Sequence, residues 1–188
     1  HDSRRLGGTP QNPVRVDLPC AWYGKDMESN DSWIWPIRPE HVTELDAALA
    51  HSKASGRAEQ AATRDDFPLD SFATFLADML HELEYGRGFV LMRGLPVDRY
   101  SYDDLRRLYW GIGAHIGSAE SQNIKGELIQ EIRDHGFDYT KSEHRGSMSS
   151  AELRPHCDIT DIVGLVCLRT AKEGGESTIR SAMTIYNE

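Results

Sequence analysis

The spacing of apolar residues changes along this chain, and this change limits the fold more than any other feature of the sequence. Apolar side chains recur at helical spacing in three segments of the first 117 residues. The spacing then falls to two in residues 127–133, and apolar runs follow at 162–168 and 177–183, which predicts three strands. Helices followed by strands, without βα alternation, predict an α+β fold.

The three expected helices have local signals at their ends. Pro39 begins the first helix, of about four turns. The second helix covers residues 68–83 and ends before two glycines. Ser101 and Asp104 resemble a capping box at the start of the third helix. Between the second and third helices, the apolar residues 89–92 predict a short buried strand.

The first 38 residues are rich in proline, glycine and tryptophan. Such a segment is typical of irregular or edge-strand structure whose aromatic rings pack on a core elsewhere. We expect a packing role for the four tryptophans, rather than a role as a platform for nucleic-acid bases: Trp22, Trp33, Trp35 and Trp110.

Charge and composition narrow the classes of partner. Asp and Glu outnumber Lys and Arg by 30 to 21, and the formal net charge is -9. A field of this sign repels phosphate backbones, and the sequence has no basic patch, so we expect no nucleic-acid partner. No apolar run approaches transmembrane length, so we expect no membrane partner. Three cysteines without Cys-x-x-Cys spacing favour a cytoplasmic location, and homo-oligomerisation stays open.

His156 and Asp158 are the strongest candidates for chemistry. On an extended chain, side chains at i and i+2 point to the same face, so an imidazole and a carboxylate can converge on one ion. With a second, remote His, such a pair forms the facial triad of non-haem iron(II) oxygenases. The alternative for the bare motif is a strand-edge His that forms a salt bridge with a nearby Asp.

The order of motifs around this pair resembles the TauD/TfdA (taurine dioxygenase-like) family of iron(II)- and 2-oxoglutarate-dependent oxygenases. The resemblance covers residues 86–188, a little over half of the chain. It rests on five pieces in sequence: residues 88–94, residues 126–134, His156-Cys-Asp158, the apolar run 163–168, and the Gly-Gly-Glu-Ser turn within 171–177.

The resemblance implies a double-stranded β-helix (jelly-roll) core with N-terminal helices, incomplete at the C-terminus. Residues 1–85 are then an N-terminal irregular and helical segment, and residues 86–188 are the first part of the oxygenase domain. By the same resemblance, His156 and Asp158 bind iron(II). The family's remaining ligand, a distal His, and an Arg that binds 2-oxoglutarate are expected in a C-terminal part that follows Glu188.

The resemblance also assigns a role to the hydroxyl group after the Gly-Gly turn. Ser177, or Thr178 if the register shifts by one residue, is expected to hydrogen-bond the distal carboxylate of 2-oxoglutarate. The alternative is that both are ordinary strand residues after a turn. Gln122 and Asn123 are candidates for substrate binding, and their alternative role is to satisfy the local backbone.

Other polar residues are weaker candidates for a functional role. Residues 134–150 are a long polar segment, interpreted as either a lid over the substrate or a plain surface loop. His115 is expected to pack within the third helix, and His135 and His144 to be solvated or to touch substrate.

These features together predict an enzyme that oxidises a small organic substrate, most simply by hydroxylation. It would use iron(II), 2-oxoglutarate and O2, and would release succinate and CO2. Three alternatives remain: a non-catalytic jelly-roll module that binds a metal or ligand, an inactive fragment, and a metal-dependent hydrolase with a zinc-bound water.

Overall fold

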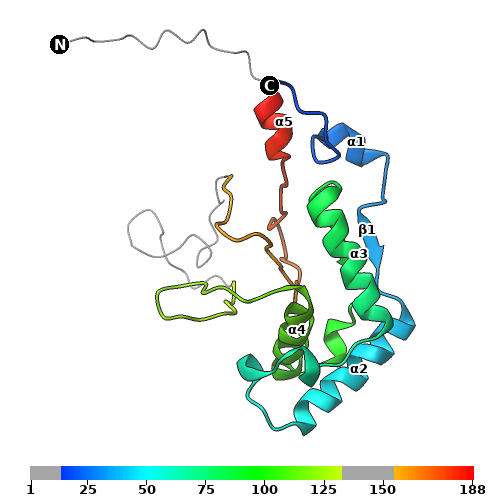
Figure 1. Cartoon of the computed structure of the whole chain (residues 1–188), viewed down its shortest axis with the longest axis vertical. Helices are drawn as coiled ribbons and strands as arrows, with labels where there is room; N and C mark the ends of the chain where they lie inside the picture. Colours follow the sequence, from blue (N-terminus) through cyan, green and yellow to red (C-terminus); the bar gives the residue numbers. More distant parts are fainter. Residues whose placement is uncertain (1–13, 133–154) are drawn as a thin grey trace, which may run out of the picture.

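The computed structural model describes residues 14–132 and 155–188. Helices α2, α3 and α4 pack together at one end of the molecule, and the short helices α1 and α5 lie near each other at the opposite end (Figure 1). The elements in chain order are α1 (Gly24–Glu28), β1 (Ile34–Pro36), α2 (Pro39–Ala54), η1 (Glu59–Ala61), η2 (Arg64–Asp66), α3 (Ser71–Tyr85), β2 (Leu91–Arg93), η3 (Val97–Arg99), α4 (Tyr102–Ile116) and α5 (Ala182–Asn187).

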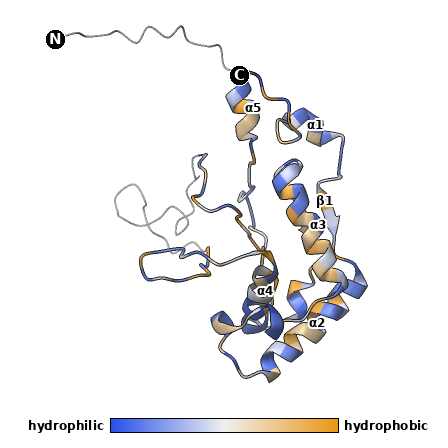
Figure 2. Cartoon of the chain, viewed as in Figure 1, coloured by the Kyte–Doolittle hydropathy of each residue, from blue (hydrophilic) through white to orange (hydrophobic). Residues whose placement is uncertain are grey.

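The three long helices confirm the helical spacing in the sequence. Helix α2 has Pro39 in its first turn and extends for 16 residues. Helix α3 ends where the backbone reaches Gly86. At the start of α4, the Ser101 hydroxyl accepts a hydrogen bond of 3.1 Å from the Asp104 amide, which satisfies one of the free N–H groups of the first turn. Figure 2 shows hydrophilic and hydrophobic residues interspersed along α2 and α3, and the buried residues of α3 are the apolar Phe72, Leu76 and Met79.

The strand expected at residues 89–92 is present, two residues further along the chain. Strand β2 pairs in parallel with β1, with Trp35 opposite Met92. The prediction that this strand is buried is wrong, since Leu91 is 42% exposed. A two-stranded sheet packs one face on the helices, through Met92, and leaves the side chains of its other face in solvent.

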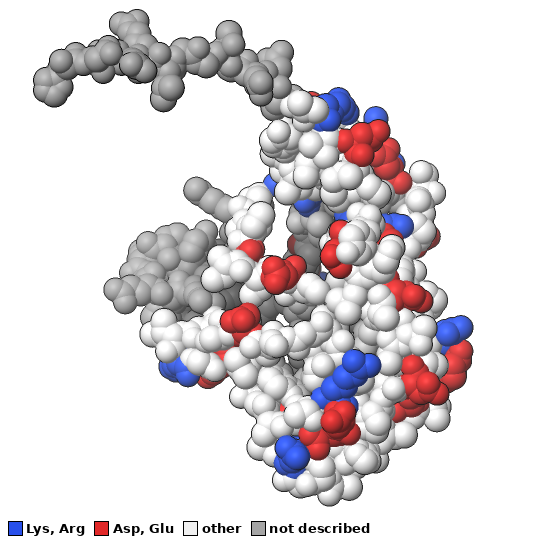
Figure 3. Space-filling model, in the orientation of Figure 1, with Lys and Arg blue, Asp and Glu red and all other residues white. Residues whose placement is uncertain are grey.

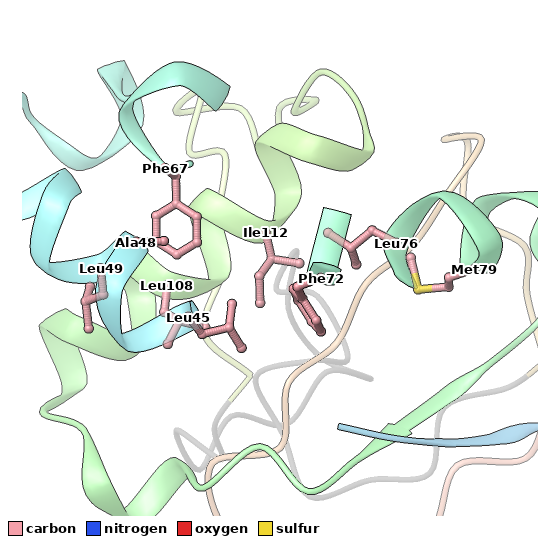
Figure 4. Packing of buried hydrophobic residues seen from close by; sticks show 9 residues of the cluster. All are labelled: Leu45, Ala48, Leu49, Phe67, Phe72, Leu76, Met79, Leu108 and Ile112. Atoms are coloured by element: carbon pink, nitrogen blue, oxygen red, sulfur yellow. The ribbon is translucent and has the colours of Figure 1, made fainter. Parts of the chain in front are cut away.

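The core lies between the three long helices and the loop that follows η2. Figure 4 shows its buried side chains, which come from all three helices and from the loop residue Phe67. Phe67 and Phe72 are both 0% exposed. The ring of Phe67 lies directly against Gly111 of α4, where an added Cβ would be 2.3 Å from the ring. Glycine at this position therefore allows the close approach of loop and helix.

A carboxylate from α2 caps the first turn of α3. Glu44 accepts hydrogen bonds from the Ser71 hydroxyl at 2.6 Å and from the amides of Asp70 and Phe72. Burial alone would raise the pKa of Glu44, but these hydrogen bonds and the nearby His41 outweigh it, and the net effect lowers the pKa. The contact joins two helices by satisfying N–H groups that no intrahelical carbonyl can reach.

The tryptophans pack as expected. The Trp22 and Trp33 rings lie 5.1 and 5.9 Å from the Phe89 ring, and the Trp35 ring lies 5.5 Å from Phe75. Trp110 donates a hydrogen bond of 2.8 Å from its ring nitrogen to the carbonyl of residue 62. These contacts tie the proline-rich N-terminal segment to the helices.

The three strands expected after Gly117 are not present in the described residues, and this prediction is wrong for the structure. Residues 127–132, 162–168 and 177–181 have no strand conformation, and the run 177–183 ends within helix α5. A strand requires a neighbouring backbone for its hydrogen bonds, and the only sheet formed by the described residues is β1–β2. The described residues thus combine helices with few strands, and the jelly-roll core stays a prediction.

Within the described residues, no helix has both the length and the apolar character needed to cross a membrane.

Candidate metal and co-substrate site

His156 and Asp158 lie on an irregular stretch of backbone that follows the undescribed residues 133–154. Both side chains are exposed, as is Cys157 between them. An imidazole nitrogen and a carboxylate oxygen are donors that suit iron(II). The described residues contain no group of three or more His, Cys, Asp or Glu side chains close enough to hold a metal ion. The donor types of His156 and Asp158 therefore suit a metal such as iron(II), and within the described residues no third such side chain joins them.

The segment after this pair is anchored to α4 by one hydrogen bond. The hydroxyl of Tyr109 donates to the carbonyl of Gly164 at 2.6 Å, and burial raises the pKa of this tyrosine. A Cβ at residue 164 would lie 2.9 Å from the same hydroxyl oxygen, so the helix and the segment meet closely here. Tyr109 thereby fixes the chain six residues after Asp158.

Apolar side chains in the same segment face solvent. Ile159 is fully exposed and Leu165 is 71% exposed. Such a run of apolar residues without cover is unusual for a folded monomer and indicates a surface that another part of a protein covers.

Ser177 and Thr178 follow two glycines with an unusual backbone conformation. Gly174 and Gly175 have φ of 68° and 78°, which L-residues with side chains rarely adopt, and the chain bends at residues 172–173, just before them. Both hydroxyl residues are exposed. They stand four and three residues before Ser181, the N-cap of α5, so that helix fixes where this stretch of chain ends.

Gln122 and Asn123 belong to a locally hydrogen-bonded loop. The Asn123 side-chain oxygen accepts from the amides of Lys125 and Glu127, at 2.9 and 3.3 Å, and its side-chain nitrogen donates to the Glu127 carboxylate. The Gln122 side-chain amide donates to the carbonyl of Glu120 at 3.0 Å. These bonds are those expected for the local role, and a role in substrate binding stays a prediction.

No other histidine among the described residues completes the site. His115 is a packed helix residue, as expected, because its Nε2 lies 2.7 Å from the carbonyl oxygen of Phe67 in the core. Its Nδ1 is buried and has no hydrogen-bond partner. His135, His144 and the proposed lid at 134–150 lie outside the described residues. On the face shown in Figure 3, basic side chains are interspersed with acidic ones.

Two shallow surface hollows lie elsewhere on the molecule. One is lined by Asp46 of α2 and Arg99 of η3, and the other by His81 and Arg87 near the end of α3. Neither is lined by His156, and neither is part of the candidate site.

The comparison with protein families identifies the lineage. Residues 51–188 match the family described as "Taurine catabolism dioxygenase TauD, TfdA family". The chain belongs to the TauD/TfdA family. The match includes the His156-Cys-Asp158 motif and the Gly-Gly turn, and it begins at residue 51, well before the residues 86–188 that carried the resemblance. The region that matches the family therefore also includes α3 and the end of α2.

Two curated relatives show the same relationship. The chain is 30% identical over 168 residues to FR-33289 synthase of Streptomyces rubellomurinus, covering 89% of this chain and 50% of that protein. It is 26% identical over 177 residues to the taurine hydroxylase-like protein SAT17 of Stachybotrys chartarum, covering 89% of this chain and 45% of that protein. The chain thus spans about half the length of the curated relatives it matches.

The sequence interpretation missed Tyr109 as the anchor of the TauD/TfdA motif segment. The available signal was Gly164, a single glycine within the apolar run 162–168, because such a glycine often marks the close approach of another group. The contacts of α5 with residues 16–23 were also missed, since nothing in local spacing relates two segments about 160 residues apart.

Proposed function

We propose that this protein is part of an iron(II)- and 2-oxoglutarate-dependent dioxygenase that hydroxylates, or otherwise oxidises, a small organic substrate. The observation that carries the proposal is the family match over residues 51–188, which includes both His156-Cys-Asp158 and the Gly-Gly turn before Ser177. The name of one relative, a taurine hydroxylase-like protein, supports an oxidative reaction on a small molecule.

In this proposal His156 and Asp158 hold the iron through a neutral imidazole and an ionised carboxylate. Both groups must lose their proton to offer a lone pair, so metal binding competes with protons at acid pH. A third ligand, a His, and an Arg for 2-oxoglutarate would come from residues outside those described. When bound, iron(II) with 2-oxoglutarate supplies the oxidation of substrate by O2, with release of succinate and CO2.

Ser177 is the proposed donor to the distal carboxylate of 2-oxoglutarate, with Thr178 as the alternative. A hydroxyl group can donate one hydrogen bond to a carboxylate oxygen, and a bond to a charged acceptor is stronger than one between neutral groups. Ser177 follows two positive-φ glycines, a backbone conformation that residues with side chains rarely adopt.

The proposal is tested by the fate of 2-oxoglutarate in the full-length protein. Purified protein with iron(II), O2 and 2-oxoglutarate is expected to form succinate slowly without a primary substrate and faster with one. Removal of iron by a chelator abolishes succinate formation, and zinc does not restore it. Succinate formation that is indifferent to iron would contradict the proposal.

A second candidate, a binding module without catalysis, is favoured by one observation: the described residues contain no group of three or more His, Cys, Asp or Glu side chains that could hold a metal ion. Such a module would bind a metal or 2-oxoglutarate with measurable affinity and form no succinate. The same experiment therefore separates the two functions.

A further inference from the structure

The stability of helix α5 cannot be explained by its length or by burial of its side chains. It has six residues, none of them buried. Isolated helices shorter than about 12 residues are marginal in water because the first turn is costly to form. The helix must therefore be stabilised by contacts with another segment.

Those contacts are hydrogen bonds from one side of α5 to the backbone of residues 16–22. Thr184 donates from its hydroxyl to the Trp22 carbonyl at 2.7 Å, and Ser181 donates to the Cys20 carbonyl. Asn187 makes two bonds with Val16: its amide nitrogen donates to the carbonyl at 2.8 Å, and its oxygen accepts from the amide at 2.9 Å. The three helix residues are spaced three apart, so they share one side of α5.

Ser181 has a double role at this interface. It is 8% exposed, and its hydroxyl accepts from the Thr184 amide at 2.9 Å while donating to residue 20. At the other end of the helix, the Tyr23 hydroxyl donates to the Glu188 carboxylate at 2.6 Å. The N-terminal segment thus contacts α5 from its N-cap to its last turn.

The same N-terminal segment is fixed to the helical core. The ring nitrogen of Trp22 donates to the Arg87 carbonyl at 2.9 Å, and its ring lies against Phe89, just before β2. Figure 1 shows α5 beside the start of the described N-terminal segment, at the end of the molecule away from α2 and α4. Residues 16–23, here called the strap, therefore link α5 to the core.

We propose that the strap positions the 2-oxoglutarate-binding turn. Ser177 and Thr178 are exposed and stand just before Ser181, so the helix that follows them is their nearest ordered anchor. The strap holds this helix through Thr184 and Asn187. This inference rests on the proposed function of Ser177 and Thr178, and it assigns the strap a positioning role with no direct contact to co-substrate.

The test compares variants of the full-length protein that differ by single hydrogen bonds. Thr184→Val keeps the shape and removes the hydroxyl, Asn187→Leu removes the paired bonds to Val16, and Thr184→Ser restores a hydroxyl. Ile185→Ala is the matched control, because Ile185 lies in the same helix and is exposed. The readouts are amide hydrogen exchange in residues 182–187, and the affinity and KM for 2-oxoglutarate with iron(II) present.

Thr184→Val and Asn187→Leu are each expected to speed exchange of the α5 amides about fivefold or more, since the first removes one hydrogen bond to the strap and the second removes two. The KM for 2-oxoglutarate rises by about threefold or more, while kcat and iron affinity change by less than about twofold. Thr184→Ser and Ile185→Ala stay near wild type.

Unchanged α5 exchange in both variants overturns the strap as the support of the helix. Faster exchange with unchanged 2-oxoglutarate affinity overturns its positioning role. If the wild-type protein with iron(II) binds no 2-oxoglutarate, the proposed function fails and the positioning role fails with it, while the exchange rates still decide whether the strap orders α5.

Discussion

The helical part of the molecule, residues 34–116, and the part that carries the candidate site, residues 155–188, are stabilised in different ways. The helical part has a buried core in which Phe67 and Phe72 have no exposed surface. In the site part Leu165 is 71% exposed, and order depends on single hydrogen bonds such as Tyr109 to Gly164 and on the strap.

The difference shows whether the apolar side chains of each part find packing contacts within the described residues. The apolar side chains of α2, α3 and α4 find one another within the described residues. The apolar side chains of residues 159–168 do not, and this chain spans about half the length of its curated relatives. The helical part therefore packs its own core, whereas residues 159–168 keep exposed apolar side chains in the described structure.

Truncation of apolar side chains gives the largest expected contrast between the two parts. Phe72→Ala should lower the free energy of unfolding by about 3–5 kcal/mol, because it leaves a cavity in the core. Leu165→Ala in this 188-residue chain should change it by less than about 0.5 kcal/mol, because the side chain is already in water. Urea denaturation measures both. A larger cost for Leu165→Ala in the full-length protein would show that further residues cover this segment.

Two glycines of α4 provide a sharper test of the core. Alanine normally stabilises a helix interior by about 1 kcal/mol relative to glycine. Gly111→Ala should instead destabilise by about 1–3 kcal/mol, because its Cβ would overlap the Phe67 ring. Gly113→Ala, which meets no atom within 4 Å, should stabilise. Thermal unfolding with equal signs for the two variants would contradict the packing of Phe67 on α4.

The cap between α2 and α3 predicts a pH dependence. The pKa of Glu44 is lower in the folded protein than in the unfolded chain. Its contribution to the free energy of unfolding is therefore full above the unfolded pKa and is lost as the pH falls through the folded pKa. Glu44→Gln should cost about 1 kcal/mol at neutral pH, and its difference from wild type should shrink as pH falls below about 4.

The matched control for the cap is Glu40→Gln, also on α2. Glu40 forms an exposed ion pair with Arg38, which is expected to contribute less than about 0.5 kcal/mol. Urea denaturation at several pH values compares the two variants. Equal effects of both, or a Glu44→Gln effect that grows in acid, would contradict the capping role.

The smallest expected effect is that of removing the Tyr109 hydroxyl, which holds residue 164 against α4. Tyr109→Phe removes the hydrogen bond to Gly164 and should speed amide exchange in residues 162–166 severalfold, with global stability changed by about 1 kcal/mol or less. Tyr85→Phe, an exposed tyrosine on α3, is the control. Exchange that is the same in both variants would mean that the segment is held by other contacts.

Sequence spacing predicted the parts whose order is local. Pro39, Ser101 and the glycine after α3 marked helix ends correctly, because caps and breakers act within one turn of the chain. The strands expected at 127–133, 162–168 and 177–183 failed, because an apolar run forms a strand only where another backbone pairs with it. The end of the last run became helix α5, which depends on residues about 160 positions away.

The candidate site was predictable only as an ordered set of motifs. The spacing of His156 and Asp158 indicated a shared ligand role, and the family match includes this spacing. Gly164 indicated a close approach but not its partner Tyr109, and the strap had no sequence signal, since these hydrogen bonds are mostly to backbone groups, which every residue has. The ligand roles of His156, Asp158, Ser177 and Thr178 stay proposals.

Iron binding by ligand variants tests the central claim most directly. In the full-length protein, His156→Ala and Asp158→Ala should each lower iron(II) affinity at least about tenfold with the fold intact by circular dichroism. Cys157→Ser, the exposed residue between them, should bind iron like the wild type. Unchanged iron affinity in His156→Ala and Asp158→Ala would contradict their assignment as ligands.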